Sequence, residues 1–292
     1  MKTIGFDMAA DKKSDKNAAD LQQEAAGNAA GQAAEKAEET GTENKNPSPV
    51  RSLVQVAFDN GQSPLTYYND RFDLKQGDVV YVEGKMEGQR GHVISLTKTF
   101  KIRLSDYKRV IGVADRSVKG RLYFGGSHLI SFDRNALPYE KVLTWMKAPE
   151  PEGTEYVSGS DDETFPLDDL GQMNVSDAVG ERGVDYYRQN RICFLELDGC
   201  RGRALAEGTK TYEVEFTCED GQISGLVCDC LCAYHCKHEV AVMLQLSETL
   251  KCIEEKYADE YAESGYFSAV SRELFFTVAA TGKEKGSMEV EI

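Results

Sequence analysis

Short runs of alternating apolar and polar residues fill residues 53–104. Such alternation is typical of strands that bury one face. Asn60-Gly61, Gly77-Asp78 and further glycines separate the runs, and these residues favour tight hairpin turns. The pattern predicts a small, curved antiparallel barrel of about five strands.

The alternation continues over residues 111–132 and should extend this sheet. Residues 138–146 then predict a short helix that carries Trp145, the only tryptophan. We therefore assign residues 50–147 to a barrel domain with an extension.

A second patterned region begins near Val175. Residues 174–188 predict a helix, and four strand-like segments follow, at residues 191–197, 202–207, 211–217 and 222–227. After them, apolar residues recur every three or four positions from Val240 to Tyr257, which predicts an amphipathic helix. We assign residues 175–292 to a second domain, and the fold class is α+β.

Two segments lack such patterns. Residues 1–49 are rich in alanine and polar residues, with no aromatic residue between Asp7 and Gln55, so they bury too little surface to order and should be disordered. Residues 148–181 contain ten acidic residues and no lysine or arginine. Because like charges repel, we expect residues 148–174 to form an extended acidic linker.

The overall charge limits the partners. The chain has 34 basic and 49 acidic residues, a net charge of −15, which disfavours a protein dominated by nonspecific nucleic-acid binding. Residues 51–109 have ten basic and seven acidic residues, which permits a modest basic face there. We find no apolar run of membrane-spanning length and no signal-peptide core, so we expect a cytoplasmic protein.

Cysteine and histidine gather in one short stretch. Cys228, Cys230, Cys236 and His238 lie within eleven residues, which is the ligand content of one zinc site. In a reducing cytoplasm, clustered cysteines indicate metal binding rather than disulfides. Cys232 and His235 lie in the same loop and leave other four-ligand sets chemically possible.

The spacing predicts the local backbone. Residues two apart on an extended chain point to the same side, so Cys228 and Cys230 can both face one ion. Residues two apart inside a helix diverge by roughly 200°. We therefore expect the helix to begin between or at Cys236 and His238.

This order of elements resembles the SWIM zinc finger: a tyrosine-bearing helix (Gly183-Val184-Asp185-Tyr186-Tyr187), a small sheet, CxC, a loop, and CxH opening a helix in Cys236-Lys237-His238-Glu239. The resemblance covers residues 179–250. It implies that Cys228, Cys230, Cys236 and His238 bind one zinc ion. Four protein ligands leave no position for water or substrate, so the site should be structural.

Flanking segments add two weaker resemblances. Gly265-Tyr266-Phe267 and a hairpin-like segment at residues 274–292 resemble SWIM-containing proteins of Gram-positive anaerobes. The run from Gly77 to Gly84, followed by Gly88 and Gly91, resembles SH3-like barrels of the PSP1 and KOW type.

The remaining cysteines and histidines lack metal-site spacing. We expect Cys232 and His235 to be spectators or to hydrogen-bond to the thiolates. The others are predicted to be core, turn or hydrogen-bonded residues: Cys193, Cys218 and Cys252 in the core, Cys200 in a turn, and His92 and His128 on the surface or satisfied by hydrogen bonds.

The sequence has no phosphate-binding loop, dinucleotide fingerprint, HExxH or GxSxG motif, so we expect no enzymatic activity and no small-molecule substrate. The leading interpretation is a non-catalytic adaptor whose finger and barrel bind a protein or a nucleic acid. Near the finger, the basic residues are interleaved with acidic ones, which favours a protein partner over duplex DNA: Arg201, Arg203, Lys210 and Lys237. The alternative is a thiol redox switch that releases zinc on oxidation, for which the additional Cys232 is the special support.

Overall fold

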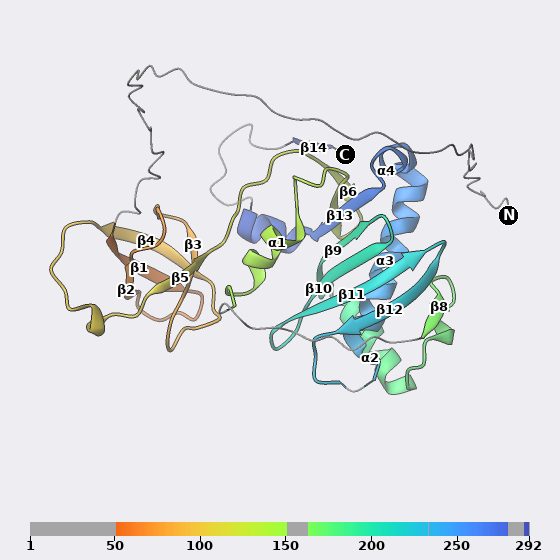
Figure 1. Ribbon diagram of the computed structural model, residues 1–292, viewed down its shortest axis with the longest axis horizontal. Helices are drawn as coiled ribbons and strands as arrows, with labels where there is room; N and C mark the ends of the chain where they lie inside the picture. Colours follow the sequence, from red (N-terminus) through yellow and green to blue (C-terminus); the bar gives the residue numbers. More distant parts are fainter. Residues whose placement is uncertain (1–50, 151–162, 233, 280–288, 292) are drawn as a thin grey trace, which may run out of the picture. The chain divides into compact units, whose positions relative to one another are not determined.

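Two sheets and the helices that cover one of them form the described part of the protein (Figure 1). The computed structural model describes residues 51–150, 163–232, 234–279 and 289–291. The α+β class is confirmed. The predicted disordered tail, residues 1–49, lies outside the described residues.

The smaller sheet has five strands in the order β2-β1-β4-β3-β5. They are β1 (Ser52–Phe58), β2 (Leu65–Asn69), β3 (Val79–Val82), β4 (Gly91–Thr97) and β5 (Val110–Val113), and a 3-10 turn, η1 (Leu104–Asp106), precedes β5. A bridge between Tyr68 and Arg109 joins the two edges, where the backbone N–H of Tyr68 donates to the Lys108 carbonyl at 2.9 Å. The sheet thus closes on itself. Its assignment to the SH3-like type stays a prediction.

Valine side chains fill this small sheet. Val54, Val56 and Val80 are fully buried within it. Gly91 must be glycine, because a Cβ there would lie 2.3 Å from a methyl of Val56 and 2.8 Å from the Phe58 ring. Gly91 is the first residue of β4, so packing against β1 rather than a left-handed turn conformation requires a glycine there.

The larger sheet has nine strands in the order β14-β6-β7-β13-β9-β10-β11-β12-β8. All pairs are antiparallel except β14 with β6. In chain order the strands are β6 (Arg121–Gly125), β7 (His128–Ser131), β8 (Thr164–Pro166), β9 (Ile192–Asp198), β10 (Arg201–Glu207), β11 (Thr211–Glu219), β12 (Gln222–Cys228), β13 (Tyr266–Ser271) and β14 (Glu289–Glu291). The four predicted strands after residue 190 are confirmed as β9 to β12.

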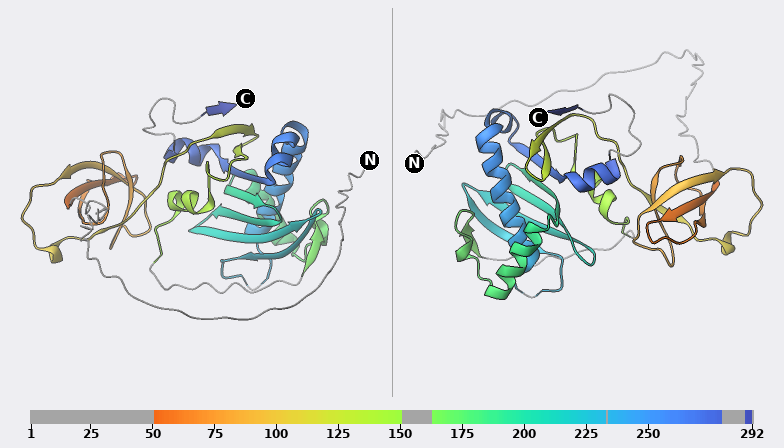
Figure 2. Two further views of the ribbon diagram at one scale, coloured as in Figure 1. Left: turned by 45° about the horizontal axis from the view of Figure 1, so that its top comes forward. Right: turned by 180° about the vertical axis from the view of Figure 1, so that it is seen from behind.

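Helices cover both faces of this sheet (Figure 2). The long helix α3 (Lys237–Lys256) packs with α2 (Asp177–Arg188) on one face, where Val242 and Leu246 belong to the same buried core as Ala204 of β10. The short helices are α1 (Tyr139–Met146), α4 (Ala258–Ser264), α5 (Arg272–Leu274), η2 (Leu170–Gln172) and a π-helical segment, η3 (Phe275–Ala279). On the opposite face, α1 and η3 pack against Leu205. Among the described residues, none of the helices has the length and apolar character that a membrane crossing requires.

The predicted domain boundary does not separate the two sheets. The sequence assigns β6, β7 and α1 to the barrel domain, but β6 and β7 belong to the larger sheet. Every residue of β7 is buried, with Leu129 facing α1 and Ile130 facing the core beneath α3. Strand β7, which is buried on both faces, pairs with a strand along each edge. One of these strands is β6, and the other is β13, over a hundred residues later in the chain.

The predicted acidic linker is wrong for its second part. Residues 151–162 lie outside the described residues, but the chain is ordered from Glu163 onward. Strand β8 pairs with β12, and Phe165 and Met173 are buried in the core beneath α3. Two apolar anchors and a short ladder of backbone hydrogen bonds therefore outweigh the repulsion between the flanking carboxylates.

The predicted hairpin at residues 274–292 is also wrong where the structure describes it. Residues 272–279 are helical. The last strand, β14, pairs in parallel with β6, a segment far away in the chain, and with no other described strand.

His128 gives the fold a testable pH dependence. Both ring nitrogens are bonded, one to the Ser127 hydroxyl at 2.9 Å and the other to the Ile192 carbonyl at 2.8 Å. Burial lowers the pKa of His128 to about 4, whereas an unfolded histidine titrates near 6.5. The unfolded state therefore binds the proton more tightly, and stability is lost as the pH falls from about 6.5 towards 4.

We expect the loss of unfolding free energy between pH 7 and pH 5 to be smaller in His128→Gln than in the wild type by about 2 kcal/mol. Urea denaturation at both pH values measures it. His92→Gln alters a half-exposed imidazole and should keep the wild-type difference. Equal pH dependence in His128→Gln and wild type would contradict the assignment.

Candidate metal centre

The four predicted ligands converge where β12 ends and α3 begins. Cys228 is the last residue of β12, Cys230 follows in the turn, Cys236 caps α3, and His238 lies in its first turn. Their ligand atoms all lie within 4.8 Å of one another. His238 Nδ1 is 3.7 Å from Cys228 Sγ and 3.6 Å from Cys236 Sγ. This cluster can hold one metal ion.

The start of α3 is fixed by a capping box between Cys236 and Glu239. The Glu239 carboxylate accepts a hydrogen bond from the backbone N–H of Cys236 at 2.8 Å. The predicted helix start is confirmed, since α3 begins at Lys237, between the two ligands. The positive end of the helix dipole therefore faces Cys236 and favours its thiolate form.

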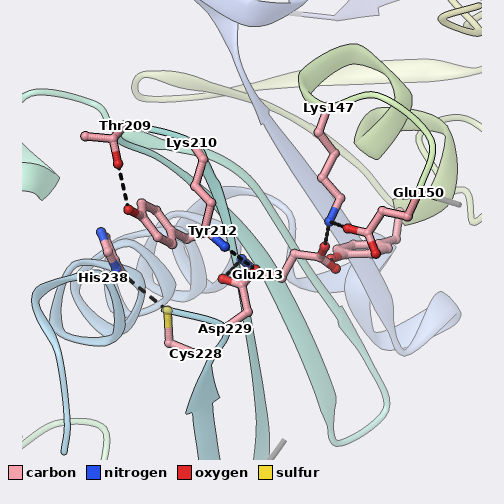
Figure 3. Close-up of polar contacts among 10 residues, drawn as sticks. Lys147, Glu150, Thr209, Lys210, Tyr212, Glu213, Cys228, Asp229 and His238 are labelled. Atoms are coloured by element: carbon pink, nitrogen blue, oxygen red, sulfur yellow. Dashed lines mark hydrogen bonds and ion pairs between the residues drawn. The ribbon is translucent and has the colours of Figure 1, made fainter. Parts of the chain in front are cut away.

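Asp229 holds the turn between the first two cysteines (Figure 3). Its backbone N–H donates to the Glu213 carbonyl at 3.0 Å, and its carboxylate accepts from the backbone N–H of Glu213 at 2.9 Å. Lys210 approaches the same carboxylate at 3.5 Å. Asp229 is thus hydrogen-bonded to Glu213 of β11 through both its backbone and its side chain. These bonds orient Cys228 and Cys230 before any ion binds.

Aromatic rings orient His238. Its imidazole stacks on Tyr212 with ring centroids 4.1 Å apart, and Tyr186 of α2 meets it edge-on at 5.3 Å. His238 is buried, and its Nε2 atom has no hydrogen-bond partner among the described residues. A neutral imidazole that binds an ion through Nδ1 carries its proton on Nε2, so Nδ1 is the nitrogen that could ligate an ion shared with the sulfurs.

The three thiols of the cluster shift one another's pKa values. A hydrogen bond from Cys228, followed by one from His238, lowers the pKa of Cys236 well below its usual range. The same hydrogen bond to Cys236, together with burial, raises the pKa of Cys228, and burial raises the pKa of Cys230. Three thiolates this close, one buried and two half-buried, are unfavourable without a cation. A divalent ion would supply the missing charge, so the donor set fits a soft or borderline divalent metal.

His235 and Cys232 do not join the cluster. Cys232 is exposed. His235 was expected to be a spectator or a partner of the thiolates, but its ring nitrogens bond to carboxylates instead: Nδ1 to Glu239 at 2.9 Å and Nε2 to Glu163 at 3.0 Å. His235 therefore connects the loop to the first turn of α3 and to the residue before β8.

The sequence reasoning missed the residues that brace the site. Glu239 could have been found, because a glutamate three residues after a helix cap is the signature of a capping box. The roles of Glu163 and Tyr212 could not have been predicted. Glu163 contacts His235, 72 residues later in the chain, and Tyr212 contacts His238, 26 residues later.

The other predicted cysteine and histidine roles are mostly confirmed. Cys193 is buried, and burial raises its pKa. Cys218 and Cys252 are half-buried against the core beneath α3. Cys200 is exposed in the turn between β9 and β10.

The loop between the ligand pairs exposes two large side chains. Leu231 is fully exposed and Tyr234 is 87% exposed. Along the chain they lie between Cys230 of the cluster and His235.

No family model matches this chain, and no curated protein or solved structure matches it either.

We expect His235→Ala to weaken metal binding about 10- to 100-fold, because it frees Glu239 and Glu163 from the loop. Competition with a chromogenic chelator measures the affinity. Tyr234→Ala, which removes an exposed side chain next to it, should leave the affinity unchanged. Wild-type affinity in the His235 variant would show that the carboxylate bonds do not support the site.

Proposed function

We propose that Cys228, Cys230, Cys236 and His238 bind one zinc ion, and that residues 179–250 form a SWIM-type finger. The observation that carries the proposal is the convergence of three thiols and one imidazole within 4.8 Å at a strand end and a helix start. Thiolate and imidazole donors together favour zinc among the abundant divalent ions. A cytoplasmic location, where thiols stay reduced, is part of this proposal.

The proposed role of the ion is structural. Four protein donors complete a zinc coordination sphere and leave no site for a water nucleophile. The ion would hold the end of β12 against the first turn of α3. We therefore propose a non-catalytic adaptor.

The surface around the finger supports a protein partner. Three of the four nearby cations already have intramolecular partners: Lys237 lies 4.1 Å from the centroid of Tyr186, Lys210 approaches Asp229, and Arg203 pairs with Glu196. Such cations are less available for phosphate contacts. The exposed Leu231 and Tyr234 instead offer apolar contact area on a braced loop.

A nucleic-acid contact, if the adaptor makes one, belongs on the small sheet. Residues 98–109 contain five basic residues and one acidic residue. Four of these cations are exposed and form no ion pair with a described residue: Lys98, Lys101, Arg103 and Lys108. This loop is compatible with the proposed PSP1/KOW-like barrel as a place for phosphate contacts.

Metal stoichiometry of the purified protein tests the zinc proposal. We expect one zinc ion per chain, lost in Cys236→Ala and kept in Cys232→Ala, because only Cys236 belongs to the buried cluster. Elemental analysis together with protein quantification measures the ratio. Zinc retained in Cys236→Ala, or lost in Cys232→Ala, would require a different ligand set.

A salt-dependent mobility-shift assay separates the two kinds of partner. If nucleic acid binds, the triple variant Lys98→Glu, Lys101→Glu, Arg103→Glu should abolish the shift of a single-stranded oligonucleotide at low salt. The matched control reverses three exposed cations on α2 and α3: Arg188, Lys251 and Lys256. No shift of single- or double-stranded nucleic acid by the wild type at low salt would remove the nucleic-acid version and leave a protein partner.

The redox alternative rests on the neighbouring thiols of Cys230 and Cys232, which interact with each other. Oxidation of both to a disulfide by a peroxide would remove one zinc ligand. Zinc retained after mild peroxide treatment would exclude such a switch.

A further inference from the structure

A second polar site lies on the face of the larger sheet that α1 only partly covers. Leu205 of β10 packs beneath α1 and η3. Along the same face the alternation of β10 continues to Arg203 and Arg201, and neighbouring strands contribute Glu196 and Glu215. These residues line a cavity of about 600 Å³, within the size range of small-molecule sites.

The floor of this cavity is an oriented ion pair between the buried Glu196 and the partly exposed Arg203. The Glu196 side chain is only 7% exposed, and its Oε1 atom accepts from Arg203 Nε at 2.8 Å and Nη2 at 2.6 Å. The Tyr266 hydroxyl donates to the other oxygen at 3.4 Å. Burial raises the pKa of Glu196. The hydroxyl of Ser268, which pairs in register with Glu196, is buried without a partner among the described residues.

Tyrosine rings hold the guanidinium groups of the cavity. Arg203 lies 4.1 Å from the centroid of Tyr139, and Arg134 lies 5.0 Å from that of Tyr266. Arg134 also pairs with Asp198 at 2.6 Å. One face of each ring is therefore taken by an arginine, and the site offers fixed charges rather than open aromatic platforms.

The charges at the rim decide the class of ligand. Three arginines and four carboxylates line the cavity: Arg134, Arg201, Arg203, Glu140, Glu196, Asp198 and Glu215. Arg134 pairs with Asp198, and Arg203 with Glu196 and, at 3.1 Å, with Glu140. Arg201 and Glu215 are exposed and make no ion pair with a described residue.

Arg201 and Glu215 lie diagonally across neighbouring strands, since Arg203 is opposite Glu215 and Arg201 is opposite Thr217. Diagonal neighbours lie about 7–8 Å apart, and their Cβ atoms lie somewhat closer. A purely anionic ligand would meet Glu215 and Glu140, and a purely cationic one would meet Arg201. A ligand with both charges, separated by about the length of a peptide unit, satisfies both rim groups.

We propose that this cavity binds a small zwitterion of dipeptide size, with its carboxylate on Arg201 and its ammonium group on Glu215. The cavity contains none of the four metal-ligand candidates, although its strands β9 to β11 belong to the residues of the proposed finger. The Glu196–Arg203 pair holds the floor and keeps Arg203 in place beside Arg201.

The test uses the full-length, metal-loaded protein and alanyl-alanine as probe, with binding followed by calorimetry or by amide chemical shifts. We expect saturable binding with a Kd of about 1 mM or tighter. N-acetyl-alanyl-alanine, which lacks the ammonium group, and alanyl-alanine amide, which lacks the carboxylate, should each bind about tenfold or more weakly.

Two rim variants assign the contacts. Arg201→Gln should weaken alanyl-alanine about tenfold but leave the amide unaffected, and Glu215→Gln should weaken alanyl-alanine but leave the acetylated peptide unaffected. Arg188→Gln removes an exposed arginine on α2 and is the matched control. Both rim residues are exposed, so the melting temperature and zinc content should stay at wild-type values.

Three outcomes would overturn the proposal. One is no saturation up to about 10 mM dipeptide, well above the Kd expected for such a site. Another is equal binding of the free and capped peptides. The third is wild-type affinity for alanyl-alanine in both rim variants, which would place any binding elsewhere.

Discussion

The convergence of three thiols and one imidazole is the interaction on which the rest of the account depends. It joins the last residue of β12 to the first turn of α3, two elements that contribute to one core. The thiols lie too close together to ionise at once without a cation, and an ion that binds all of them would tie the sheet to the helix. An ion bound there would fix the position of α3 against β12 and the core that α3 covers.

Secondary contacts prepare that cluster from several directions. Tyr212 of β11 stacks on the imidazole, Asp229 fixes the cysteine turn, and Glu239 caps the helix while it holds His235. A polar chain continues from β11, where Glu213 accepts hydrogen bonds from Tyr139 of α1 and Lys147 just after it (Figure 3). Strand β11 thus connects α1, on one face of the larger sheet, with His238 of α3, on the other face.

Local patterns in the sequence predicted the local geometry well. The start of α3 followed from the two-residue spacing of Cys236 and His238, which a helix interior cannot aim at one point. Pairings between distant segments could not be predicted. The burial of β7 on both faces depends on β13, the order of residues 163–174 depends on the anchor Phe165, and the Glu196–Arg203 pair depends on the register of β9 and β10. Alternation shows that a strand has two faces but not which strand lies beside it.

Removal of the metal tests the central claim most directly. Hydrogen exchange and thermal melting should be compared for metal-loaded, chelated and zinc-restored protein. The account predicts that chelation lowers the melting temperature and speeds exchange at residues 228–240, and that zinc restores both, because the ion closes the contact between β12 and α3. Unchanged melting and unchanged protection in the chelated protein would contradict it.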